Sequence, residues 1–129
     1  MKKSATPMVS PAEWEVMETI WKHGSRAARD VFASLQTEKT WDIKTVRTLL
    51  ARLVEKGALE YDQIGNSYLY RAAYTREQLI CGEVREVAKR SLDGSISGLF
   101  AAFLQEEQLT PEELEKMQKL LNSARKEGP

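Results

Sequence analysis

Apolar residues recur at helical spacing in three segments of the first half of the chain. The first segment runs from Ser10 to Gly24, and its start places Pro11 and Glu13 one and three residues after the serine. This combination is typical of a capped helix N-terminus, and glycine commonly ends a helix. The expected apolar stripe of this helix comprises Trp14, Met17 and Trp21, with Val16 and Ile20 beside them.

Two further helices are predicted, over residues 26–36 and from the cap Asp42 to Gly57, joined by the polar residues 37–40. Their expected inward positions are Val31, Phe32, Leu35, Val46, Leu49, Leu50 and Leu53. After Gly57 the pattern changes to alternation, and "ALEYDQ" and "SYLYRA" each indicate a short strand. Residues 64–66 suit the turn between these strands, because Gly and Asn tolerate positive φ.

Three helices followed by a β-hairpin are the element order of a winged helix-turn-helix domain. Thr40-Trp41 is expected to add a short third strand beside the hairpin. Capping patterns then start helices at Thr75 and Thr110, and Ser95 or Ser97 starts one between them, after a break at residues 93–94. We therefore predict a mainly α fold with a small hairpin wing. A winged-helix DNA-binding domain, residues 1–74, precedes a helical dimerisation domain, residues 75–129.

The large apolar side chains of residues 75–129 are the reason to expect a homodimer. Three short helices bury too little surface to cover them, whereas two copies around a twofold axis would. The alternative is that these helices fold back onto the first domain, which already has inward-facing residues of its own. The residues expected at the dimer contact are Ile80, Val84, Val87, Leu99, Phe100, Phe103, Leu104, Leu114, Met117 and Leu121.

Composition places the chain among globular proteins, with 129 residues that are 42% hydrophobic and 29% charged. No apolar run is long enough to cross a bilayer, and the first residues lack the apolar core of a secretory signal. A single cysteine, Cys81, excludes an intrachain disulfide and fits a reducing compartment. We therefore expect a cytoplasmic protein.

The formal net charge of zero excludes a strongly basic coat, so any binding of nucleic acid has to be local to one surface. The predicted third helix offers such a surface. Its outer face carries Lys44, Thr45, Arg47 and Thr48, with Asp42 at the cap as the only nearby acid. Long donors and hydroxyls near the N-terminus of an exposed helix suit the DNA major groove. The alternative is an ordinary solvated helix face.

Three further residues are weaker candidates for DNA contact. Arg52 lies one turn beyond the others, where it could instead pair with a neighbouring acid. Asn66 at the hairpin tip and Tyr68 beside it could reach a phosphate or the minor groove, or the wing could only brace the domain.

The only histidine, His23, suits the last turn of the first helix. We expect no metal, cofactor or catalytic site, because no ligand cluster or nucleophile–base pair stands out.

Three stretches, "SPAEWEVMETIW", "WDIKTVRTLLARLVEKGAL" and "YLYRAAYTREQ", resemble the penicillinase-repressor family of the BlaI/MecI type. The matching positions in the second stretch are Trp41, Lys44, Thr45, Val46, Thr48, Leu49, Arg52, Leu53, Lys56 and Gly57. The resemblance implies a homodimeric winged-helix repressor that binds a palindromic operator in double-stranded DNA. Family members typically silence antibiotic-resistance genes, so control of resistance or stress genes is expected.

The same resemblance implies a membrane sensor-protease system that leads to cleavage of the repressor between an Asn and a Phe. The corresponding bond is Ala102-Phe103, where Phe103 matches and Ala102 replaces the Asn. The cleavage implied by the family therefore does not apply to this chain without a change in what the protease recognises. Two other functions stay open from the residues alone. One is a winged-helix module that binds an acidic protein, and the other is a ligand- or redox-responsive regulator on the same scaffold.

Overall fold

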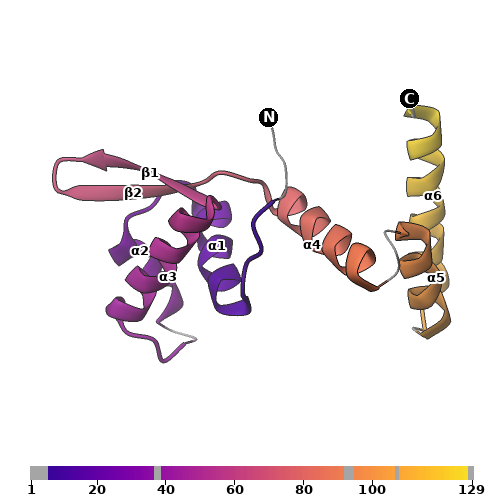
Figure 1. The fold of residues 1–129 in the computed structure, drawn as a ribbon, viewed down its shortest axis with the longest axis horizontal. Coiled ribbons are helices and arrows are strands. Elements are labelled where there is room, and N and C mark those ends of the chain that lie inside the picture. The colour runs from indigo at the N-terminus through magenta and orange to yellow at the C-terminus, as the bar shows by residue number, and fades with distance from the viewer. Residues whose placement is uncertain (1–5, 37–38, 92–94, 107, 128–129) are drawn as a thin grey trace. The chain divides into compact units, whose positions relative to one another are not determined.

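The computed structural model describes residues 6–36, 39–91, 95–106 and 108–127. The elements in these ranges are α1 (Pro11–His23), α2 (Ala28–Leu35), α3 (Ile43–Lys56), β1 (Leu59–Ile64), β2 (Ser67–Ala72), α4 (Arg76–Ser91), α5 (Ile96–Glu106) and α6 (Pro111–Glu127) (Figure 1). The chain forms two compact units, Met1–Arg85 and Glu86–Pro129, so the beginning of α4 belongs to the first unit.

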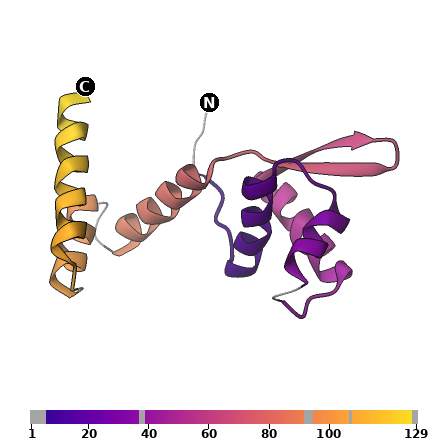
Figure 2. The same ribbon diagram turned by 180° about the vertical axis from the view of Figure 1, so that it is seen from behind.

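The first unit confirms the winged helix-turn-helix prediction. Figures 1 and 2 show α1, α2 and α3 grouped together, with the antiparallel hairpin β1–β2 extending beyond them. The core is built from the predicted inward positions of the three helices, and β1 and α4 add Leu59 and Leu79. The fully or almost fully buried core residues include Val16, Met17, Ile20, Val31, Leu35, Val46, Leu49, Leu50 and Leu53.

Most predicted helix ends are confirmed by hydrogen bonds. Asp42 accepts the Thr45 N–H at 2.9 Å, and Gly57 ends α3 with φ +86°. Ser95 starts α5 by accepting the Gly98 N–H at 3.0 Å, which decides between the two candidate serines. The capping patterns at residues 75–78 and 110–113 are also present. The expected break at 93–94 lies outside the described residues, as do residues 37 and 38 of the polar link.

The predicted third strand at Thr40-Trp41 is wrong. The residue that bridges to the hairpin is Arg26, whose N–H donates to the Tyr70 carbonyl at 3.0 Å and whose carbonyl accepts the Tyr70 N–H at 2.7 Å. This bridge keeps Arg26 extended, and α2 therefore begins at Ala28 rather than at 26. Trp41 instead packs, partly buried, against the core, which keeps it away from the ladder.

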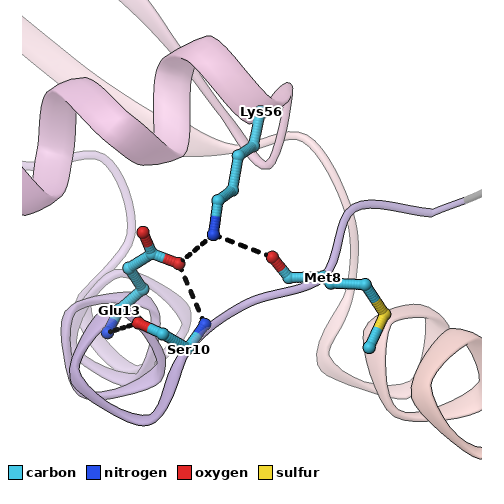
Figure 3. Close-up of polar contacts among 4 residues, drawn as sticks. All are labelled: Met8, Ser10, Glu13 and Lys56. Carbon is cyan, nitrogen blue, oxygen red and sulfur yellow. Dashed lines mark hydrogen bonds and ion pairs between the residues drawn. The ribbon is translucent and has the colours of Figure 1, made fainter.

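An ion pair between a buried carboxylate, Glu13, and the exposed Lys56 joins the start of α1 to the end of α3 (Figure 3). Glu13 is only 2% exposed, and its Oε1 accepts the Ser10 N–H at 2.9 Å and the Lys56 ammonium at 2.5 Å. Lys56 also donates to the Met8 carbonyl at 2.9 Å. Burial alone would raise the pKa of Glu13, but the hydrogen bonds from Lys56 and Ser10 and the Lys56 charge outweigh burial and lower it. Glu13 thus stays ionised inside the fold.

The helices of the second unit leave large apolar side chains exposed. Neither α5 nor α6 contains a fully buried residue among those described. Phe103 is 49% exposed and Leu120 is 71% exposed. Surface of this kind on consecutive helices is typical of a region that another chain covers.

We predict that Lys56→Met lowers the free energy of unfolding by about 1–3 kcal/mol, because it leaves the Glu13 carboxylate buried without its cation. Urea unfolding measures the change. Lys22→Met is the control, since Lys22 is exposed on α1 and has no ion pair among the described residues. An equal loss in both variants would contradict a special role for the Glu13–Lys56 pair.

The pH dependence of that difference is a separate prediction. The folded-state pKa of Glu13 is depressed, so its stabilising contribution is present above the ordinary carboxyl value of 4.5 and is lost as the pH falls below it. Protonation also removes the unpaired charge that destabilises Lys56→Met. The gap in unfolding free energy between the two proteins should therefore shrink on acidification below this value. A gap that stays constant from neutral pH to pH about 3 would refute the assignment.

Candidate nucleic-acid interface

The outer face of α3 is exposed as predicted. Lys44, Arg47, Thr48 and Arg52 are exposed and Thr45 is half-buried, while the apolar positions of the same helix are buried. These five residues are called the α3 ridge below. The helix separates the two sets because its apolar positions repeat at three- and four-residue intervals and the ridge fills the opposite side.

The acid at the N-terminal end of the ridge caps the helix. Asp42 accepts the backbone N–H of Thr45, and this hydrogen bond is the main reason that the pKa of Asp42 is lowered. The Thr48 hydroxyl donates to the Lys44 carbonyl at 3.1 Å, so it is engaged with the helix backbone and keeps its acceptor capacity. The side chains left for an anionic partner are therefore the cations Lys44, Arg47 and Arg52.

An open groove of 550 Å³ brings part of the ridge together with the hairpin. Arg47 from α3 lines this groove, and so do Asn66 and Tyr68 from the hairpin. Three predicted site residues from separate elements thus meet at one surface. Lys44, Thr45, Thr48 and Arg52 do not line the groove and lie along α3 outside it.

Sequence reasoning missed the contribution of α2 to the groove. Residues 27–30 line it, and the N-cap Ala27 makes no side-chain hydrogen bond to the helix start. An uncapped helix N-terminus presents free N–H groups that favour an anion. Arg29, which lies in this stretch, adds a cation and Asp30 an acid. The available signal was the alanine at the position where most helices have Ser, Thr, Asp or Asn.

The hairpin register gives its two faces opposite characters. Tyr61 pairs with Tyr70 and Gln63 with Tyr68, so these four side chains share one face. On it Tyr61 and Tyr68 stack with ring centres 4.5 Å apart, and all but Tyr61 line the groove. Sequence reasoning named only Tyr68 among them, although the alternation of the two strands contained the signal.

The acids of the hairpin lie on its other face. Glu60 pairs with Arg71 across the strands, and Arg71 also reaches Asp62, whose Oδ2 lies 3.0 Å from its Nε. The hydrogen bonds from Arg71 to Asp62 and Glu60 raise the pKa of Arg71. Both carboxylates are therefore paired with Arg71 and turned away from the face that carries the tyrosines.

Burial raises the pKa of Tyr70 on the groove face, while the charge of Arg47 acts in the opposite direction. Arg47 and Tyr70 both line the groove. A cation beside neutral phenols, facing an open groove, is an arrangement that binds a polyanion without competition from an adjacent carboxylate of the hairpin.

Cys81 and His23, the residues that could suggest redox or metal chemistry, do not line the groove. In the described part of the chain no group of three or more His, Cys, Asp or Glu side chains is placed to hold a metal ion. Cys81 and His23 are both exposed. None of the helices that the structure describes has the length and apolar character to span a membrane.

Similar proteins are penicillinase repressors and methicillin-resistance regulators. A family model described as penicillinase repressor matches residues 9–123. The penicillinase repressor of Bacillus licheniformis is 34% identical over 121 residues, which cover 94% of this chain and 93% of that protein. The methicillin resistance regulatory protein MecI of Staphylococcus aureus is 28% identical over 114 residues, covering 88% of this chain and 93% of MecI.

Solved structures agree with these relatives for the first unit. The DNA-binding domain of the repressor BlaI matches with a TM-score of 0.53 and 40% identity, covering 60% of this chain and 93% of that one. Monomeric Bacillus licheniformis BlaI in complex with the blaP half-operator matches with a TM-score of 0.51, 40% identity and the same coverage. With the model match across most of its length, the chain belongs to the penicillinase repressor family of DNA-binding transcriptional repressors.

Proposed function

We propose that two copies of this repressor bind one palindromic operator, each with α3 in the major groove of a half-site. The observation that carries the proposal is the α3 ridge, a row of cations and hydroxyls on an exposed helix face whose N-terminal acid, Asp42, is engaged as the helix cap. A duplex groove needs donors of this kind on an exposed helix. The solved complex of BlaI with a half-operator supports DNA, rather than an acidic protein, as the partner.

Each ridge residue has a role that its chemistry suggests. Arg47 donates a bidentate pair to a guanine edge, and Lys44 and Arg52 neutralise phosphates. Thr45 and Thr48 contact the backbone or a thymine methyl. Because the formal net charge is zero, affinity depends on these local cations and falls steeply with added salt.

The hairpin and α2 hold the DNA backbone beside the ridge. Asn66 and Tyr68 contact a phosphate or the minor-groove edge from the wing. The uncapped start of α2 and Arg29 offer a second phosphate position across the same groove. These contacts fix the register of the repressor without reading the bases.

The second half of the chain, residues 75–129, is proposed as the dimerisation domain, and residues 1–74 as the DNA-binding domain. The apolar contact comprises Ile80, Val84, Val87, Leu99, Phe100, Phe103, Leu104, Leu114, Met117 and Leu121. Several of these side chains, including Phe100, Leu104 and Leu121, are exposed in the single chain, which supports their burial against a second copy. Two half-sites about one helical turn apart, or a multiple of it, match such a dimer.

We further propose that the repressor acts in the cytoplasm on resistance or stress genes. A membrane sensor-protease system ends the repression. The bond Ala102-Phe103 lies inside α5, and both residues are exposed. A protease needs extended backbone, so cleavage there requires α5 to open locally. The alanine at 102 changes what the protease has to recognise.

We predict that Arg47→Ala weakens binding to operator DNA by about 1–3 kcal/mol and leaves binding to scrambled DNA nearly unchanged, because a guanine contact is lost. Fragments selected from the source genome by the protein provide the operator, and titration on both DNAs gives the affinities. Lys44→Ala is the contrast and should weaken both DNAs alike, with a salt slope smaller by about 1. Unchanged operator affinity in Arg47→Ala would remove the base contact.

We predict that Phe103→Glu turns the dimer into a monomer while the helical circular-dichroism signal is retained, because a charge enters a face that is exposed in the single chain. Sedimentation equilibrium measures the mass. Gln105→Glu is the matched control, since it adds the same charge to the same helix at an exposed polar position. A wild-type chain that sediments as a monomer, or a variant that stays dimeric, would refute this contact.

A further inference from the structure

The face of α1 that is remote from the groove carries a cluster that none of the proposed roles uses. Trp14, Glu18 and Trp21 follow one another at four- and three-residue spacing, so they lie along one side of the helix. The Trp14 indole N–H donates to Glu18 Oε2 at 2.9 Å. The two tryptophan rings meet edge to face with centres 5.3 Å apart.

The start of α4 is attached to this cluster at three points. Arg76 forms an ion pair with the other carboxylate oxygen of Glu18, and its guanidinium carbon lies 5.5 Å from the centre of the Trp21 ring. The Trp21 indole N–H donates to the carbonyl of Tyr74, two residues before Arg76, at 2.9 Å. We call these five residues, Trp14, Glu18, Trp21, Tyr74 and Arg76, the α1–α4 latch.

Two further contacts hold the same stretch of α4 within the first unit. Leu79 is 1% exposed and belongs to the core. Gly82 approaches the N-terminal segment so closely that a Cβ there would lie 1.7 Å from Thr6 Oγ1 and 3.0 Å from Thr6 Cβ. Glycine inside a helix normally costs stability, and a close packing partner is a reason for it. The beginning of α4 is therefore held by α1, by the core and by residue 6.

We propose that the α1–α4 latch fixes the direction in which α4 leaves the first unit, and that Arg76 is a positioning residue for binding two half-sites at once. This inference rests on the proposed function, a dimer on a palindromic operator. Once one half-site is bound, the effective concentration of the second DNA-binding unit at its half-site depends on the stiffness of the connection. A stiff start of α4 favours one distance between the half-sites. A loosened start lowers the gain in affinity from the second half-site and tolerates more distances.

Arg76 suits this role because it acts at the junction alone. It is exposed, it lies outside the buried core, and it does not line the groove with Arg47, Asn66 and Tyr68. An exposed ion pair and an exposed cation–π contact each contribute only weakly to stability. Loss of the ion pair and the cation–π contact together therefore loosens the start of α4 from α1 without unfolding the first unit.

The test compares the full-length wild type with Arg76→Ala on three kinds of DNA: a single half-site, the full operator, and operators whose half-site spacing is altered by a few base pairs. We expect unchanged half-site affinity and unchanged dimer mass. Full-operator affinity should fall about three- to tenfold, and the dependence of affinity on spacing should become flatter. Arg76→Lys keeps the charge but loses the planar guanidinium near Trp21, and should fall between the two.

Arg85→Ala is the matched control. It removes the same charge from the same helix nine residues further on, and Arg85 has no ion pair among the residues that the structure describes. Its spacing profile should follow the wild type. Glu18→Gln is a second test variant, since it breaks the ion pair and keeps an acceptor for Trp14, and it should reproduce Arg76→Ala if that variant folds poorly.

Two results would overturn the inference. One is an equal loss on half-site and full operator, which would mean that Arg76 only stabilises the first unit. The other is a spacing profile as steep in Arg76→Ala and Glu18→Gln as in the wild type. Failure of the underlying proposed function gives a different result, because the wild type itself would then sediment as a monomer or show no gain from the second half-site.

Discussion

The buried carboxylate of Glu13 sets the arrangement on which the candidate nucleic-acid interface depends. A charge at that depth is tolerated only with a partner, and Lys56 at the last turn of α3 supplies it. The same carboxylate closes the capping box of α1. One side chain therefore fixes the start of one helix and the end of another. The orientation of α3, and with it the direction of the α3 ridge, follows from this joint contact and from the core beneath.

The fold, rather than the order of residues along the sequence, decides which charged side chains face the candidate interface. The chain is formally neutral, yet three acids near the candidate interface are engaged elsewhere: Asp42 caps α3, and Glu60 and Asp62 pair with Arg71 on the far face of the hairpin. Toward the groove lie Arg47 among tyrosines and, from α2, the cation Arg29 and the acid Asp30. A neutral protein can thus present a local cationic surface to a polyanion, which keeps binding sensitive to salt.

On the proposed function, the start of α4 links DNA recognition to dimerisation. Its first turns pack into the unit that carries the ridge, and the same helix continues into the segment proposed for dimerisation. A repressor of two half-sites needs a defined connection between these tasks, since the gain from the second site depends on geometry rather than on added contacts. The latch on α1 uses aromatic and ionic contacts at the surface, which leaves the core of the unit free to determine the fold.

Periodicity, caps and turn residues in the sequence determined the order of helices and hairpin, the inward faces of α1 to α3, and the exposed ridge from Lys44 to Arg52. These features are local, because each depends on residues within a turn or two of one another. Only the tertiary structure decided which distant backbone joins the hairpin, Arg26 rather than Thr40-Trp41, and that the uncapped α2 start meets the wing at one groove. It also decided that Lys56 reaches Glu13 and that Arg76 reaches Glu18. Those pairings lie 43 and 58 residues apart, and only the packing of whole elements brings such residues together.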